Sequence, residues 1–356
     1  MLKQISLLIL CAVAIVLFAT PVQACTSAVV SGKVTLDGRP LLWKNRDTDF
    51  MRNHVDYVKG ERYDFIAVVN SANAYLKEAW MGTNSAGFAL MNTQSYNLVD
   101  VKGDEERGAA NGRVIYRALE VCATVEDFCH FLDTISKPSD IEANFGVIDA
   151  QGGAAMFEVD YYKYVMYDAN NPKDAPYGYI ARTNFSFAGK VNEGAGYVRY
   201  MEADQVLMKA SATGNITPQF IFNDLSRSFR NRMLDIDLRS GGYNRPQASG
   251  WFIDQDFIPR SSTSCSVVVQ GVKPGVKAEL TTMWTLLGYP PTGIAVPLWV
   301  KDAGKLLPGM VRFNKEHEAA LLSDWSLRLA DRVFSYKQGM GTGRYLNWER
   351  LYSPGK

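Results

Sequence analysis

The sequence predicts a mixed α and β fold in which most strands are antiparallel. Candidate strands come first along the chain, followed by helices, further strands and a closing helix, whereas a doubly wound parallel sheet would alternate the two. Apolar runs at 26–34 and 41–45 flank Asp37-Gly38, a strong hairpin signal. No internal repeat or low-complexity linker divides the chain, so we expect residues 25–356 to form one domain.

The candidate strands are apolar and β-branched runs bounded by turn residues. They are residues 26–34, 41–45, 65–69, 79–81, 87–92, 145–148, 154–159, 177–182, 264–270, 278–286 and 295–299. Helical periodicity predicts helices at 112–122, 125–135, 197–210, 218–229 and 315–336. Thr124 with Asp127 approximates a capping box at the start of the second helix, and Pro218 suits the first position of the fourth.

Residues 1–24 have the pattern of a secretory signal peptide. Lys3 precedes an uncharged, largely apolar stretch of about 14 residues, too short to span a membrane, and Val22-Gln23-Ala24 resembles a cleavage site. We therefore expect a secreted or periplasmic protein that begins at Cys25. An alternative is a lipoprotein signal, which would leave Cys25 acylated and the protein anchored.

The composition limits the kinds of partner. Lys and Arg total 38 against 37 for Asp and Glu, and removal of Lys3 would balance them, so nucleic acid and anionic membranes are not expected partners. No later stretch is longer and uncharged, so no membrane span is expected. Four cysteines in so long a mature chain do not form a disulfide scaffold, and none has metal-site spacing with histidine. A homo-oligomer is possible.

A cysteine at the first mature position carries a nucleophile and a base on one residue. The thiol is intrinsically nucleophilic, and an α-amine has an ordinary pKa of about 7.7–8.0, so it can take the thiol proton near neutral pH. No histidine is needed for this chemistry. A papain-like pair with His54 is the weaker alternative, because His130 and His317 fall in predicted helices.

The opening of the predicted mature chain resembles one branch of the N-terminal nucleophile hydrolases. Cys25-Thr26-Ser27, the Asp37-Gly38 turn and Lys44-Asn45-Arg46-Asp47 are similar to the start of choloylglycine hydrolases, penicillin V acylases and penicillin acyltransferases, the peptidase C45-like group of linear amide hydrolases. This resemblance implies a four-layer αββα sandwich with two mainly antiparallel sheets. It also implies no metal or organic cofactor and a small-molecule amide as the substrate.

The resemblance also implies roles for individual residues. Cys25 would be the nucleophile, Asp47 would orient its amine, and Asn92 and Asn184, in segments similar to the family's Gly-x-Asn and Thr-Asn motifs, would stand near the tetrahedral intermediate. The expected substrate-binding residues are Lys44, Arg46 and Arg260. Lys44 replaces the arginine of bile-salt hydrolases and is a candidate contact for a substrate carboxylate. Arg260 is a candidate substitute for an arginine that these enzymes carry after a Ser-Ser run.

The sequence therefore predicts an exported amidase that hydrolyses a linear, non-peptide amide of an N-acyl compound through a thioester on Cys25. Two alternatives stay open: an acyltransferase that uses the same residues but transfers the acyl group to an amine, and a lipid-anchored binding protein that keeps the scaffold without the reaction. The residues do not identify the acyl group or the amine.

Overall fold

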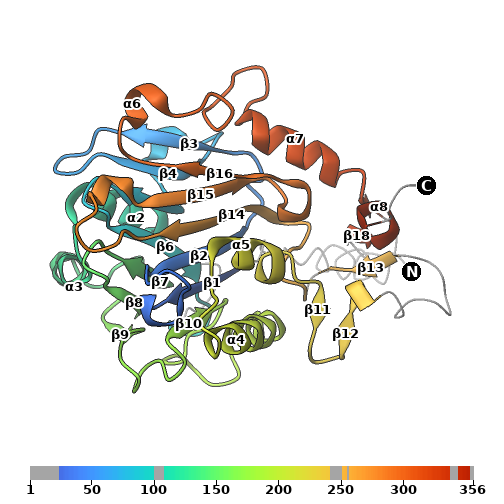
Figure 1. Cartoon of the computed structure of the whole chain (residues 1–356), viewed down its shortest axis with the longest axis horizontal. Coiled ribbons are helices and arrows are strands. Elements are labelled where there is room, and N and C mark those ends of the chain that lie inside the picture. The colour runs from blue at the N-terminus through green and yellow to red at the C-terminus, as the bar shows by residue number, and fades with distance from the viewer. Residues whose placement is uncertain (1–23, 100–107, 241–250, 255, 337–343, 353–356) are drawn as a thin grey trace, which may run out of the picture.

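Two large antiparallel sheets form the centre of the computed structural model (Figure 1). The structure describes residues 24–99, 108–240, 251–254, 256–336 and 344–352. The predicted signal peptide, apart from Ala24, lies outside the described residues.

The first sheet has six strands and contains the start of the predicted mature chain. Its order is β10-β1-β2-β14-β15-β16, and every neighbouring pair is antiparallel. The strands are β1 (Cys25–Val30), β2 (Leu41–Asp47), β10 (Tyr179–Arg182), β14 (Thr263–Gln270), β15 (Thr282–Leu287) and β16 (Ala295–Leu298). Strand β1 is therefore internal, with β10 on one side and β2 on the other.

The second sheet has seven strands in chain order, β3 to β9. They are β3 (Asn53–Val58), β4 (Phe65–Asn70), β5 (Met81–Asn84), β6 (Ala89–Gln94), β7 (Ala143–Ile148), β8 (Ala154–Val159) and β9 (Tyr164–Asp168). Asp149 closes the turn between β7 and β8, because its carboxylate accepts the backbone N–H groups of Gln151 and Gly153. The chain thus builds this sheet by successive short connections.

Apolar side chains alternate along the strands and form three main core clusters, one between each pair of adjacent layers. One cluster lies between the two sheets and includes Val29, Leu42 and Met91. A second joins the seven-stranded sheet to α2 (Asn111–Val121) and α3 (Val125–Thr134), and a third joins the six-stranded sheet to α4 (Tyr197–Ser211) and α5 (Pro218–Phe220). The predicted α+β class with four αββα layers is confirmed.

Smaller elements lie around the margins of the two sheets (Figure 1). The strands are β11 (Arg230–Asn231), β12 (Ile236–Asp237), β13 (Trp251–Ile253), β17 (Phe334–Tyr336) and β18 (Arg344–Asn347), and the helices are α6 (Ala303–Leu306), α7 (Leu321–Ala330) and α8 (Trp348–Tyr352). A separate apolar cluster that includes Phe229, Tyr289 and Phe334 joins several of them to the end of α7.

Several predicted elements need correction. The sequence pattern missed β3 and β9, which are the edge strands of their sheet and carry polar or exposed side chains where a buried strand would be apolar. The predicted helix 315–336 shrinks to α7, because Glu318 adopts a positive φ of 51° and residues 334–336 form a strand. The predicted helix 218–229 ends earlier: after α5, residues 221–225 form one π-helical turn.

The first hairpin has a different centre from the one predicted. Cys25 lies opposite Arg46, which centres the connection about two residues before Asp37-Gly38. The connection contains a short 3₁₀ turn, Gly32–Val34, and Thr35 makes a bridge to Ile216, so it is a structured loop rather than a two-residue turn. Cys25 nevertheless lies beside the end of β2.

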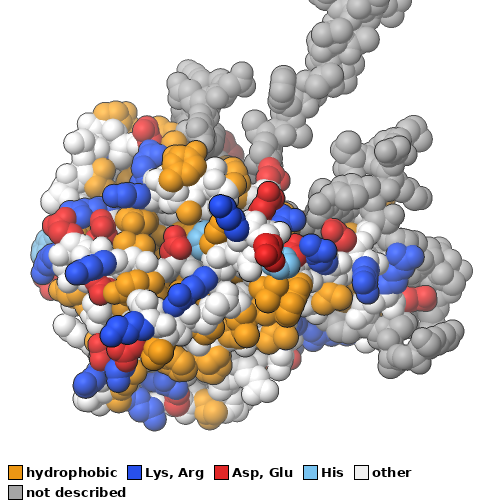
Figure 2. Space-filling view, turned by 90° about the horizontal axis from the view of Figure 1, so that it is seen from above, with side chains coloured by type: hydrophobic (Ala, Val, Ile, Leu, Met, Phe, Trp, Pro, Cys, Tyr) orange, Lys and Arg blue, Asp and Glu red, His pale blue; other side chains and the backbone are white. Residues whose placement is uncertain are grey.

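The face that bears α6 and α7 carries interspersed cations, anions and apolar side chains (Figure 2). On this face the described residues form no broad field of a single charge, in keeping with the balanced composition. In the described ranges, every helix falls short of the length and apolarity that would be required to cross a membrane.

Gly146 lets the two sheets approach each other. A Cβ atom added there would lie 2.8 Å from Leu42 and 2.9 Å from Val29 of the opposite sheet, and closer still to Met91. We predict that Gly146→Val lowers the free energy of unfolding by about 1–3 kcal/mol through overpacking. Urea unfolding measures the change. Gly309→Ala, where an added Cβ meets no atom within 4 Å, is the control and should unfold like the native protein.

Candidate active site

The ends of several antiparallel strands meet at one edge of the paired sheets. Cys25 is the first residue of β1, Asp47 the last of β2, and Thr263 the first of β14, while Asn184 follows the end of β10. The end of β6 lies across the gap, since Ser27 Oγ and Thr93 Oγ1 are 2.6 Å apart. Strand pairing thus gathers segments that are up to 238 positions apart in the sequence, from Cys25 to Thr263.

The backbone nitrogen of Cys25 is held by an asparagine. It donates to Asn184 Oδ1 at 3.0 Å, and Asn184 Nδ2 donates to the carbonyl oxygen of Gln94 at 2.8 Å. Asn184 is fully buried, and it connects the start of β1 with the end of β6 in the other sheet. Removal of the preceding residues would turn this nitrogen into an amine already in contact with a hydrogen-bond acceptor.

Arg199 of α4 holds the same two residues from the helical layer. Its guanidinium donates to the Cys25 carbonyl oxygen at 2.6 Å, to Thr26 Oγ1 at 2.9 Å and to Asn184 Oδ1 at 2.9 Å. The residue is 2% exposed, and burial lowers the pKa of its guanidinium to about 10. The sequence analysis missed Arg199, because a single arginine near the start of a helix normally faces solvent.

No hydrogen bond in the described structure joins Asp47 to the Cys25 nitrogen, whose N–H donates to Asn184. The Asp47 carboxylate accepts from Thr263 Oγ1 at 2.6 Å and from Arg260 Nε at 2.7 Å, and Asp47 and Arg260 are both largely buried. Burial by itself lowers the pKa of Arg260, but the neighbouring Asp47 carboxylate outweighs it and raises that pKa. The pair places a carboxylate and a guanidinium at the site edge. Its contribution to orienting the amine stays a prediction.

Asp254 holds the segment that carries Arg260, and the sequence analysis missed it as well. The Asp254 carboxylate accepts a hydrogen bond from the backbone N–H of Ser261, and its negative charge is one of the causes that raise the pKa of Arg260. Burial raises the pKa of Asp254 to about 6, although the Ser261 N–H and Arg260 act in the opposite direction. Nothing near Asp254 in the sequence marks it as part of this site.

Lys44 and Asn92 are in direct contact across the two sheets. The Lys44 ammonium donates to Asn92 Oδ1 at 2.9 Å and to the Trp80 carbonyl oxygen at 3.2 Å. Both residues are less than 5% exposed. Burial lowers the pKa of Lys44, while Cys25 is the nearby group that most strongly favours its charged form. The sequence therefore led to two residues that form one unit.

Arg46 is enclosed by protein groups. It donates to Asn53 Oδ1 at 2.6 Å and to Asn70 Oδ1 at 2.8 Å, and its guanidinium lies 4.5 Å from the centre of the Trp80 ring. Burial lowers its pKa to about 10. Its side chain links β2 to the seven-stranded sheet behind Cys25, and its predicted contact with substrate stays untested.

Tyr96 and His54 differ in their relation to Cys25. Tyr96 lies near it, since Cys25 is one of the groups that act on its hydroxyl, and burial raises the pKa of Tyr96. His54 lies on edge strand β3, where its ring contacts Ser71 and Asp56 at 3.0 Å. No hydrogen bond in the described structure joins His54 to Cys25, so the papain-like alternative gains no support.

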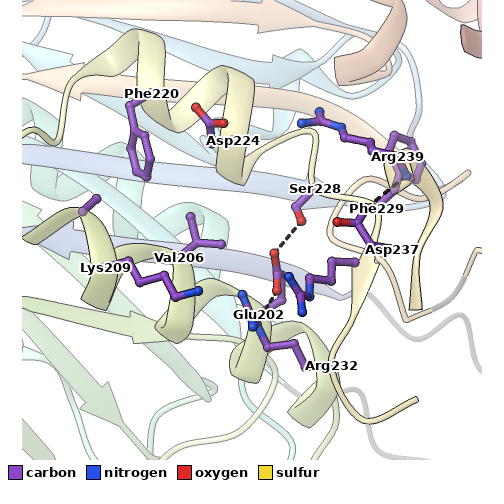
Figure 3. Close-up of a pocket in the computed structure, with 12 residues that line it drawn as sticks. Glu202, Val206, Lys209, Phe220, Asp224, Ser228, Phe229, Arg232, Asp237 and Arg239 are labelled. Atoms are coloured by element: carbon purple, nitrogen blue, oxygen red, sulfur yellow. Dashed lines mark hydrogen bonds and ion pairs between the residues drawn. The ribbon is translucent and has the colours of Figure 1, made fainter. Parts of the chain in front are cut away.

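A cavity of about 400 Å³ lies elsewhere, between α4, the 218–225 turn and the β11–β12 hairpin (Figure 3). Many of its polar groups bind one another: Glu202 accepts from Ser228 Oγ at 2.6 Å and pairs with Arg232 at 2.6 Å. None of the predicted site residues lines it. Within the described parts of the chain, no group of three or more histidine, cysteine or carboxylate side chains could hold a metal ion.

The family model of acyl-coenzyme A:6-aminopenicillanic acid acyl-transferase matches residues 35–219, more than half of the chain. The chain belongs to this family. The resemblance found in the sequence is thus confirmed, as is the prediction of an enzyme acting on carbon–nitrogen bonds other than peptide bonds. No curated protein matches the sequence.

Among solved structures, the chain is similar to a mutant of the conjugated bile acid hydrolase from Clostridium perfringens, with 12% identity over 78% of this chain and 93% of the other and a TM-score of 0.45. It is also similar to the N-acylethanolamine-hydrolyzing acid amidase ortholog of Caenorhabditis elegans, with 15% identity over 70% and 94% and a TM-score of 0.44. Penicillin V acylase from Agrobacterium tumefaciens has 16% identity over 78% and 86% and a TM-score of 0.41.

Asp254 should make the stability depend on pH. Because its pKa is raised to about 6 in the folded chain from an ordinary 3.8, its contribution is most favourable below about pH 4 and is lost as the pH rises through 6. We predict that the free energy of unfolding of Asp254→Asn, relative to that of the native protein, rises by up to roughly 3 kcal/mol as the pH is raised from 4 to 7.5. Urea unfolding at both pH values measures this rise. Asp331→Asn, at an exposed position, should show none, and a pH-independent effect of Asp254→Asn would contradict the assignment.

Proposed function

We propose that the chain is an exported cysteine amidase that hydrolyses a linear, non-peptide amide through a thioester on Cys25. The observation that carries the proposal is the buried clamp on Cys25, in which Asn184 accepts from its nitrogen while Arg199 donates to its carbonyl oxygen. This clamp fixes the residue that bears both the thiol and, after cleavage, the amine. Membership in an acyl-transferase family, from a match over residues 35–219, supports acyl transfer as the type of reaction.

The reaction begins when the Cys25 amine takes the proton of its own thiol. The sulfur attacks the amide carbon, and the carbonyl oxygen becomes an oxyanion. Collapse of this intermediate breaks the carbon–nitrogen bond, and the α-ammonium returns its proton to the leaving amine. Water, activated by the same amine, then attacks the thioester and releases the acid and the thiol.

The charged side chains around Cys25 suit these reaction steps. Lys44, Arg46 and Arg199 are buried cations, and the described structure gives none of them an ion pair with a carboxylate. Fixed positive charge in a water-poor site stabilises a developing oxyanion more strongly than it would in water. The cluster therefore favours the charge distribution of the transition state over that of the neutral amide.

The proposal includes export and cleavage of the Ala24–Cys25 bond before the mature chain folds. Ala24 is 1% exposed and Cys25 is 5% exposed, so a peptidase reaches this bond only before β1 takes its place in the sheet. A lipid-anchored binding protein fits less well, because diacylglycerol on the sulfur would need space beside a residue this buried. The intact mass of the mature protein tests the point: an unmodified Cys25 at the first position is expected, and acyl chains would exclude the proposed enzyme.

The family name favours one competing function, acyl transfer to an amine on the same residues. Incubating the mature protein with a panel of N-acyl amides, with and without an added primary amine, separates the two. A hydrolase is expected to give free acid whether or not the amine is added. A new amide formed from the added amine in preference to the acid would establish the transferase.

We predict that one extra residue before Cys25 abolishes turnover while the fold persists, because the amine becomes a peptide nitrogen that cannot act as a base. The measurement is release of amine from the best substrate of the panel, with far-ultraviolet circular dichroism as the check on folding. Full activity of the extended protein would refute the mechanism.

We also predict that Arg199→Met lowers kcat by about 10- to 100-fold, since hydrogen bonds from a charged group to the Cys25 carbonyl and Asn184 are lost. Steady-state kinetics measure the loss. Arg113→Met, which removes an exposed guanidinium from α2, is the matched control and should leave kcat unchanged. An Arg199→Met enzyme with native kcat would show that the clamp has no part in catalysis.

A further inference from the structure

Lys44 occupies a position where a charged side chain is costly. It lies on β2, opposite Ser27 of β1 and Val267 of β14, so its strand is paired on both sides. Its 2% exposure keeps the ammonium out of water, and a buried ammonium needs several hydrogen bonds to offset the loss of hydration. The partners that it finds are both uncharged, Asn92 Oδ1 and the carbonyl oxygen of Trp80.

The contact with Lys44 decides which way the Asn92 amide faces. An asparagine side chain has one acceptor oxygen and one donor NH₂ group on opposite sides. Because Oδ1 accepts from the Lys44 ammonium, Nδ2 points in the other direction, and it makes no hydrogen bond within the described structure. Without a cation on the oxygen side, the amide could turn over and present its oxygen where a donor is required.

Cys25 lies close to this pair. Among the charged groups that act on Lys44, Cys25 in its ionised form has the largest effect. The side chains of Ser27 and Thr93, which join the strands of Cys25 and Asn92, are 2.6 Å apart. The unused Nδ2 donor of Asn92 is therefore placed on the strand that faces the start of β1.

We propose that Lys44 is a positioning residue, which holds the Asn92 amide so that its NH₂ group faces the carbonyl oxygen under attack by Cys25. This inference rests on the proposed function. We prefer it to the sequence-based hypothesis that Lys44 binds a substrate carboxylate: two of its three N–H groups are used by protein acceptors, and its aliphatic stem is enclosed between the sheets.

Steady-state kinetics of three variants test the proposal. Lys44→Met and Asn92→Ala should each lower kcat by about 100-fold, the typical loss for one oxyanion donor, and leave KM within about twofold. The double variant should be no slower than Asn92→Ala alone, since Lys44 acts through Asn92. Losses that multiply in the double variant, or a raised KM with native kcat in Lys44→Met, would overturn the proposal.

Two further variants separate positioning from folding. Lys44→Arg keeps a donor and a charge, and we expect it to retain at least a tenth of the native kcat even where Lys44→Met folds poorly. Lys33→Met removes an exposed ammonium that also donates to a backbone carbonyl, at 2.7 Å from the Asn170 oxygen, and should behave like the native protein. A Lys44→Arg enzyme that folds but is as slow as Asn92→Ala would count against the proposal.

A measurement without substrate distinguishes failure of this inference from failure of the proposed function. In protein labelled with ¹⁵N-asparagine, the side-chain NH₂ signal missing from Asn92→Ala identifies Asn92. That signal should shift in Lys44→Met or Lys44→Arg and stay in place in Lys33→Met. An unchanged signal in the Lys44 variants overturns the Lys44–Asn92 contact. If the signal shifts in these variants but the native protein cleaves no amide, the proposed function is rejected and the contact stands.

Discussion

The first residue of an internal strand is the constraint on which the site depends. β1 pairs with β2 from Cys25 onward and with β10 from Ser27 onward, so the backbone of Cys25 is held directly by β2 and, two residues later, by both neighbours. Its nitrogen nevertheless lies at the end of the strand, where Asn184 takes the place of a strand partner. A rigid backbone with one free end suits a residue whose own amine must work as a base.

Burial of cations is the energetic cost of this arrangement. Lys44, Arg46 and Arg199 are each held by neutral oxygens of side chains or backbone, so their desolvation is only partly offset. Burial lowers the pKa of all three. Stability alone would favour apolar residues at these positions. Their presence at one strand edge, around one thiol, is better explained by chemistry that develops negative charge there.

The main strands could be predicted from their apolar runs, and the four layers from the family resemblance, because most buried strands are rich in apolar residues. Edge strands β3 and β9 escaped, since one side of each lacks a neighbour and tolerates polar or exposed residues. The closing helix was predicted too long, because its amphipathic pattern continues through a turn at Glu318 that only tertiary contacts select.

The same difference explains what was predicted at the site. Cys25, Asp47, Asn92 and Asn184 belong to short segments with a recognisable order, and the structure brings them to one edge. Arg199 and Asp254 carry no such signal, since their importance comes from what the fold places beside them. Lys44 was selected as a candidate contact for an anionic substrate, a role that stays a prediction, and the structure adds the hydrogen bond from its ammonium to Asn92.

The surplus of positive charge also bears on the choice between hydrolysis and acyl transfer. Both reactions share every step up to the thioester and differ in what attacks it. A primary amine is mostly protonated near neutral pH, and an ammonium ion approaching Lys44, Arg46 and Arg199 would be repelled in a region of low dielectric constant. Water meets no such barrier, and the released carboxylate is a favoured neighbour of these cations until it diffuses away. On this ground we propose water as the acceptor, in a family named for a transferase.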